Sequence, residues 1–153
     1  MKKSLPASAL TAHLGYWMRA VSNQVSQAFA AKLAGCDVTV AEWVVLRELY
    51  DRDAIVPRDL AQALGLTKGA VSKLVDRLHA KGLVTRASRA KDKRFQSVAL
   101  TGPGRTLVPD LSALADRNDA EFFGHLSAAE RVMLDLLLRD IVRRNGVTAP
   151  PLE

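Results

Sequence analysis

The stretch that most constrains this chain is residues 67–94, where a two-sided helix, a glycine stop and a short strand follow one another. At 100° per residue, one arc of the helix is apolar and the opposite arc is polar. The apolar arc holds Val71, Leu74, Val75 and Leu78, and the polar arc holds Gly69, Ser72, Lys73, Asp76 and Arg77. Gly82 supplies the left-handed residue that ends a helix, after Lys81 in its last turn. We therefore predict a helix with one face for packing and one for a charged partner.

A β-hairpin with a basic tip follows this helix. Residues 83–86 predict a short strand, and the alternation over 96–100 predicts a returning strand. Between them, four cationic residues surround Asp92; they are Arg89, Lys91, Lys93 and Arg94. Helix, hairpin and basic loop together are typical of a winged helix.

The residues before the helix predict a helix-turn-helix. Thr39 and Glu42 form a capping box that opens one helix. Pro57 occupies the first position of a short helix that Gly65 stops, and Thr67 caps the next. We expect residues 38–101 to form one winged helix-turn-helix unit.

Long helices flank this unit. An apolar stripe predicts a helix from about Ser8 to residue 33, and residues 105–145 continue with two more. Pro109 predicts a kink, or a helix that begins there. Ser127 with Glu130 caps a last helix that is apolar almost all round, which predicts burial by its own chain and by a second subunit. The fold class is mainly α with minor β, and residues 8–34 and 105–145 are the expected dimerisation helices.

Positive charge is concentrated in one part of the chain. The net charge is +6, but residues 57–94 contain ten Lys/Arg and three Asp/Glu, a surplus of seven. A solvated basic face is one explanation, and phosphate binding is the other. No stretch is apolar enough to span a bilayer, and the start MKKSLPASAL lacks the apolar core of a signal peptide, so we expect a cytoplasmic protein without a membrane partner.

Three segments, GLVTR, KDKR and VALTGPGR, resemble the signature of the MarR family of winged-helix regulators. Asp92 and Arg94 match the family's D-x-R wing pattern, and Leu100, Thr101 and Gly104 match its L-T-x-x-G exit. The family's Asp-rich wing start is replaced here by residues 89–91. The resemblance implies that Arg94 enters a DNA minor groove and that Asp92 stabilises the wing. It also implies a small aromatic or phenolic ligand bound between the dimerisation helices and the winged helix.

The predicted contacts to double-stranded DNA come from the polar helix face and the wing. Small residues allow close approach to a groove, and the neighbouring donors reach bases and phosphates. The residues are Thr67, Lys68, Gly69, Ala70, Ser72, Lys73, Arg77, Arg89, Lys91, Lys93 and Arg94. The alternatives are that the helix charges only face solvent, and that Asp92 and Arg94 are a simple hairpin ion pair.

The resemblance also raises the questions of a ligand site and of a redox site. The family's ligand would lie near His13, Tyr16, Trp17, Trp43 and Arg47, although both tryptophans also fit apolar stripes as core residues. The three histidines lack ligand spacing, so we expect neither a metal nor a cofactor. Cys36 is the single cysteine, and because Asp37 beside it disfavours a thiolate, we expect it to be inert.

The sequence thus predicts a homodimeric, ligand-responsive regulator, a repressor, that binds a pseudo-palindromic operator. Two alternatives stay open: a cysteine-based oxidative-stress sensor of the same fold, and a winged helix used only for protein contacts. An enzyme is not expected, because neither a Gly-rich phosphate loop nor a catalytic constellation is present. Operator sequence, regulated genes and effector identity do not follow from the sequence.

Overall fold

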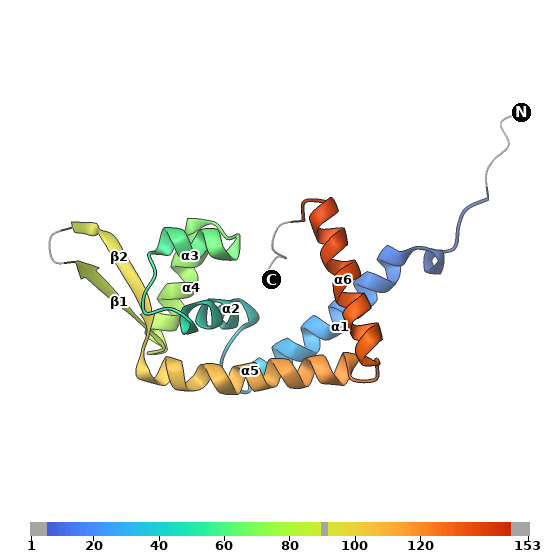
Figure 1. The fold of residues 1–153 in the computed structure, drawn as a ribbon. Helices are drawn as coiled ribbons and strands as arrows, with labels where there is room; N and C mark the ends of the chain where they lie inside the picture. The colour runs from blue at the N-terminus through green and yellow to red at the C-terminus, as the bar shows by residue number, and fades with distance from the viewer. Residues whose placement is uncertain (1–5, 90–91, 148–153) are drawn as a thin grey trace, which may run out of the picture.

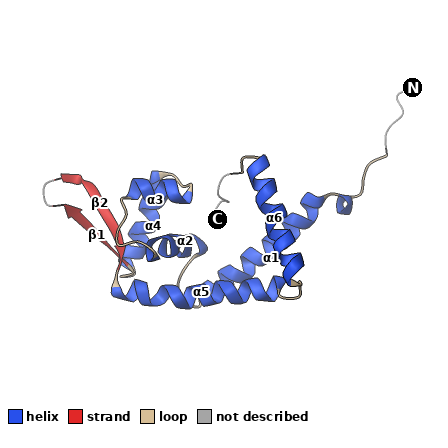
Figure 2. Ribbon diagram, in the orientation of Figure 1, coloured by secondary structure: helices blue, strands red, loops and turns tan. Residues whose placement is uncertain are grey.

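The computed structural model describes residues 6–89 and 92–147, with the backbone alone for residues 88, 89 and 92–95. The described chain is mainly helical with one small sheet (Figure 2). A long helix, α5 (Gly102–Phe123), runs along one edge of the molecule and connects two groups of elements (Figure 1). The winged helix-turn-helix lies at its beginning, and α1 (Leu14–Ala34) and α6 (Ala128–Arg144) lie toward its end.

The helices of the winged unit begin and end where the capping residues predict. The Thr39–Glu42 capping box opens α2 (Val40–Tyr50), and Pro57 stands in the first turn of α3 (Pro57–Leu64). Gly65, with φ of 65°, ends α3, and the Thr67 hydroxyl accepts from the Ala70 amide at the start of α4 (Lys68–Ala80). Gly82 follows α4 with φ of 73°, so the predicted left-handed glycine is confirmed.

The two strands are longer than predicted. β1 (Val84–Arg89) pairs antiparallel with β2 (Asp92–Leu100), with a register shift between Ser88 and Arg89. The basic residues at 89 and 92–94 therefore belong to strands, whereas the charge pattern predicted a loop. The pairing is made by backbone amides and carbonyls, which a run of charged side chains does not reveal. Ile55 forms an additional bridge to Val98, which anchors the connection between α2 and α3 to the sheet.

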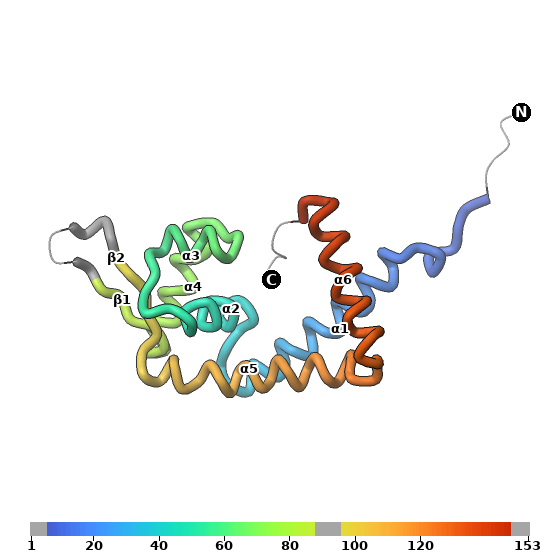
Figure 3. Tube along the Cα trace, in the orientation of Figure 1, coloured from blue at the N-terminus to red at the C-terminus, as the bar shows by residue number. Residues whose placement is uncertain are grey.

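Helix α5 begins at Gly102, where the Thr101 hydroxyl accepts from the Gly104 amide at 3.1 Å. It continues through Pro109, so the predicted alternative of a helix beginning at Pro109 is wrong (Figure 3). Val108 and Leu111 are buried on either side of this proline. Their burial offsets the backbone hydrogen bond that a proline cannot donate.

Two predictions about the flanking helices are also wrong. The first helix begins at Leu14 and not at Ser8, after a separate 3-10 turn (Leu10–Ala12) and an extended His13. Leu14 is 84% exposed, so this part of the stripe has no packing surface within the protomer. The Ser127–Glu130 capping box of α6 is confirmed, but no residue of α6 is buried by its own chain.

The hydrophobic core lies in the winged unit and its junction with α1 and α5. It includes Leu33 from α1, three residues of α2, and Val108 and Leu111 of α5. The apolar arc of α4 completes it from one side, and Val84 and Val98 of the sheet from the other. Among the described residues, no helix combines the length and the apolar character that crossing a bilayer requires.

Candidate nucleic-acid interface

Helix α4 has the two faces that its sequence predicts. Val71, Leu74, Val75 and Leu78 are all buried. The opposite side is exposed, and it comprises Lys68, Gly69, Ser72, Lys73, Asp76 and Arg77. Because the buried arc is anchored in the core, the orientation of the polar face is fixed relative to the rest of the unit.

The beginning of α4 is open to a large partner. Thr67, Lys68 and Gly69 are exposed, whereas Ala70 is half-buried. A methyl group added at Gly69 would have no heavy atom within 4 Å, so the backbone is accessible there. Lys73, one turn later, has no salt bridge to any described residue and is available for an external anion. The first two turns therefore combine an accessible backbone with free cationic side chains.

Two charged groups of α4 have partners within the protein. Asp76 forms an ion pair with Arg86 of β1, which joins the polar face to the wing. Arg77 is 57% exposed, and its Nε lies 3.9 Å from Oε1 of Glu42 on α2. Arg86 therefore offsets the negative charge that Asp76 adds to the polar face of α4.

Glu42 is buried to 1% exposure and stays charged through its partners. One carboxylate oxygen accepts from the Thr39 amide at 2.9 Å and from Lys81 Nζ at 2.9 Å. Burial raises the pKa of this carboxyl, but the hydrogen bonds from Thr39 and Lys81, with the charges of Lys81 and Arg77, outweigh it and lower the pKa below its ordinary value. Sequence reasoning assigned Glu42 only to the capping box; nothing in the pattern pairs it with Lys81, which is 39 residues later.

The side chains of the predicted wing residues lie outside the described structure. Lys91 lies outside the described residues. Arg89 belongs to β1, and Asp92, Lys93 and Arg94 belong to β2, with their side chains outside the described part. Their contacts to DNA, and the stabilising role of Asp92, stay predictions.

The five predicted ligand residues form two separate groups. At the beginning of α1, the Trp17 indole donates to the Thr11 carbonyl at 3.0 Å, Tyr16 packs edge-on against it, and His13 Nδ1 lies 3.3 Å from the Leu10 carbonyl.

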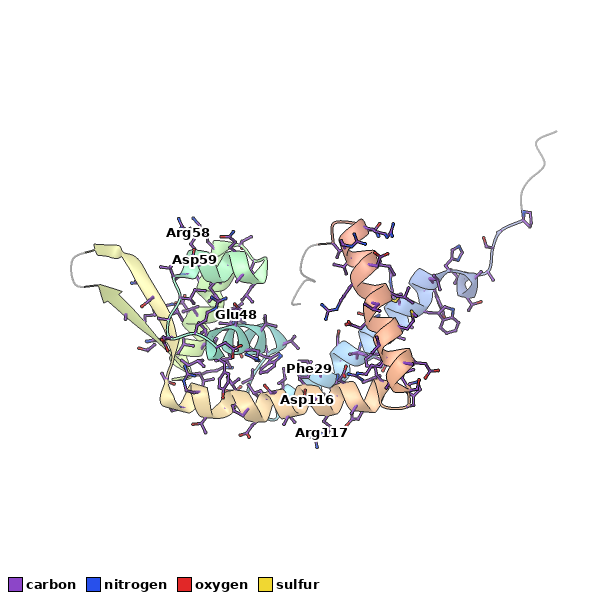
Figure 4. The ribbon with its side chains drawn as sticks, in the orientation of Figure 1. Phe29, Glu48, Arg58, Asp59, Asp116 and Arg117 are labelled. Atoms are coloured by element: carbon purple, nitrogen blue, oxygen red, sulfur yellow. The ribbon has the colours of Figure 1, made fainter. Side chains whose placement is uncertain are left out.

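The other two residues are on α2. Trp43 packs edge-on against Phe29 of α1, with ring centroids 6.4 Å apart, and Arg47 pairs with Asp51 at 2.6 Å. Phe29, where α1 passes over α5 (Figure 4), comes twelve residues after Trp17. Twelve residues span about 18 Å of helix, so one protomer does not bring the two tryptophans together.

An open hollow lies elsewhere, between the end of α5 and α6. It has a volume of about 400 Å³ and is lined mainly by Phe123, Leu126 and apolar residues of α6, with the Asp119–Arg131 ion pair among its lining residues. None of the predicted ligand residues lines it. Cys36 is half-buried in the turn between α1 and α2, and its amide donates to the Leu33 carbonyl at 2.9 Å.

Comparison with known proteins agrees with this geometry. The model of the MarR family matches residues 37–94, from the turn before α2 to the wing. The transcriptional regulator HosA of Escherichia coli O157:H7 is 32% identical over 106 residues, which are 69% of this chain and 78% of HosA. The chain belongs to the MarR family of transcriptional regulators.

Solved structures of MarR family regulators share the fold over most of the chain. The S. aureus MepR–DNA complex has a TM-score of 0.77 at 28% identity and covers 86% of this chain and 98% of MepR. Bordetella bronchiseptica BpsR, whose DNA binding is described as regulated by 6-hydroxynicotinic acid, has a TM-score of 0.76 at 28% identity. The match covers 89% of this chain and 97% of BpsR. A mutant of E. coli MarR complexed with operator DNA has a TM-score of 0.75 at 28% identity, and the match covers 84% of this chain and 93% of MarR. The predicted family and the predicted winged-helix fold are both confirmed.

Proposed function

We propose that this MarR family regulator binds operator DNA with the exposed face of α4 in the major groove and the wing along the neighbouring minor groove. The observation that carries the proposal is the burial of α4 on one face only, which fixes Lys68, Lys73 and Arg77 on the opposite, accessible face. The charge surplus of residues 57–94 favours the approach of a phosphate backbone. MepR and MarR, which share the fold, have been solved with DNA.

The operator-binding form is a homodimer in this proposal. Apolar residues of α6 are about half exposed, among them Met133, Leu137 and Ile141, which recur at four-residue spacing. Leu14 and Trp17 of α1 are exposed as well. Apolar surfaces of this kind on two helices favour a symmetric contact with a second copy. In such a dimer the two α4 helices would each bind one half-site of a pseudo-palindrome, with the half-sites about one helical turn apart.

The regulator acts as a cytoplasmic repressor, without catalysis, and a small aromatic acid releases it from the operator. BpsR supports the ligand class, since its DNA binding is described as regulated by 6-hydroxynicotinic acid. The binding site would use Trp43 and Arg47 of one chain, and His13, Tyr16 and Trp17 could contribute only if a second copy brings them near. A ligand shifts DNA occupancy only as far as it binds the DNA-incompetent state more tightly.

A peroxide sensor based on Cys36 is the second candidate. Cys36 as a residue is half-buried, which favours access by an oxidant more than full burial would. A winged helix for protein contacts alone is less favoured, because such a surface needs no surplus of cationic residues.

Selection of duplexes from a randomised library with the purified protein tests the function. We expect enrichment of a pseudo-palindrome, and a complex of two chains per duplex by sedimentation. A single half-site in the enriched sequences would contradict the dimeric proposal. Failure to enrich any motif at low salt, together with binding that is independent of salt, would contradict DNA recognition itself.

A further inference from the structure

We infer that Glu42 is a positioning residue for DNA recognition: it holds the C-terminal end of α4 against α2 and orients the guanidinium of Arg77 at the DNA-facing surface. This inference rests on the proposed function and adds to it a residue that is not itself accessible to DNA. Glu42 is on α2, whereas the predicted contacts are all on α4 and the wing.

The contacts form a small network between two helix ends. Glu42 is the third residue of α2 and lies beside the last turn of α4. Lys81, which follows α4, donates to Glu42 at 2.9 Å and to the carbonyl of Asp37 at 2.6 Å. Arg77 approaches the other carboxylate oxygen at 3.9 Å. One buried carboxylate therefore connects the start of α2 to Arg77 of α4 and to Lys81, which directly follows that helix.

Burial makes the charge of Glu42 dependent on its cationic partners. A carboxylate of 1% exposure has little water around it, so its charge depends on Lys81 and Arg77. The side chain of Lys81 is 27% exposed, whereas the side chain of Arg77 is 57% exposed. Lys81 therefore acts as the internal partner, and Arg77 is shared between Glu42 and the surface.

The sharing of Arg77 has a consequence for specificity. An arginine side chain has many rotamers, and a fixed negative partner restricts the directions in which its planar guanidinium can face. Contacts to phosphates set the register in which a recognition helix enters its groove. A freed Arg77 still attracts DNA of any sequence, but it no longer sets the register, so binding to operator and binding to random duplex become more alike.

The test compares Glu42→Gln with Glu48→Gln. Both variants remove one carboxylate from α2, but Glu48 pairs with Arg52, and neither of these two residues is among the proposed DNA contacts. Affinity for the selected operator and for a random duplex is measured by fluorescence anisotropy, at several salt concentrations. We expect Glu42→Gln to lower the ratio of the two affinities about fivefold or more, while random-duplex binding stays equal or strengthens, and Glu48→Gln to keep the ratio.

Arg77→Ala separates positioning from a general effect on the fold. In the Arg77→Ala background, Glu42→Gln should change the ratio no further, because the residue through which it acts is absent. Lys81→Met serves as a second variant if Glu42→Gln does not fold. It too should lower the ratio, because the end of α4 is then no longer held against α2 by Lys81, and Arg77 is drawn away from the DNA-facing surface as the remaining charged partner of Glu42.

Three results would overturn the inference: an unchanged ratio in Glu42→Gln, an equal fall in Glu48→Gln, or an equal fall with and without Arg77. These differ from a failure of the proposed function, in which wild-type protein binds operator and random duplex alike.

Discussion

Replacing Gly104 by alanine should destabilise the junction between the wing and α5. Gly104 is buried in the first turn of α5, and a methyl group built on it lies 2.1 Å from the carbonyl oxygen of Leu83. That oxygen also accepts the Thr101 amide at 3.1 Å, and the Thr101 hydroxyl donates to the Gly82 carbonyl at 2.7 Å. The helix start therefore has to move away from the backbone it is bonded to.

The size of the effect follows from these contacts. A normal carbon–oxygen contact is longer by more than about 1 Å, so relief of the clash stretches both Thr101 bonds. Two such hydrogen bonds contribute about 1 kcal/mol each, and insertion of a methyl into a packed site costs about 1–3 kcal/mol. The gain in helix propensity from glycine to alanine returns at most about 1 kcal/mol. We expect a net loss of about 2–4 kcal/mol in the free energy of unfolding.

Urea denaturation followed by circular dichroism measures this loss, with Gly102→Ala as the matched control. Gly102 is in the same turn, and a methyl group there meets no heavy atom within 4 Å. The control should be neutral or slightly more stable than wild type. Unfolding of Gly104→Ala and Gly102→Ala at the same urea concentration would contradict the close contact between Gly104 and the Leu83 carbonyl.

Three further predictions address pH, assembly and signal. Because the folded-state pKa of Glu42 lies below its ordinary 4.5, the stability that its charge contributes is complete above pH 4.5 and is lost as pH falls through the folded-state pKa. In urea titrations over this acidic range, the free energy of unfolding should therefore vary less with pH in Glu42→Gln than in wild type. Leu137→Glu on α6 should yield monomers in sedimentation, whereas Arg139→Gln on the same helix should not, and a dimeric Leu137→Glu would exclude this face as the interface. Cys36→Ser should release operator with an aromatic acid as wild type does; peroxide-driven release that the substitution abolishes would favour the redox alternative.

The winged unit could be predicted from sequence because its signals are local. Thr39, Pro57 and Gly65 act through their own backbone or through residues three positions away, so the helix bounds they predict are those observed. The apolar arc of α4 is likewise buried, because a single periodic helix has only one face to bury.

What could not be predicted depends on contacts between distant segments or between chains. The pairing of Glu42 with Lys81 joins residues 39 positions apart, and no pattern in either helix encodes it. The separation of Trp17 from Trp43 follows from the length of α1, although both residues fit an aromatic site by type. The apolar residues of α6 predicted burial by the chain itself and by a second subunit, and the apolar pattern does not say which of these surfaces covers which side of the helix.

Binding of Lys73→Ala to the selected operator tests most directly whether α4 is the DNA-contacting surface. Arg117→Ala is the control, since it removes the same unit of charge from α5, where Arg117 points away from α2 and α3 (Figure 4). The slope of log affinity against log salt should fall by about one unit in Lys73→Ala and stay unchanged in Arg117→Ala, with both variants as stable as wild type. Equal slopes and equal affinities for wild type and Lys73→Ala would contradict the assignment of α4 as the recognition helix.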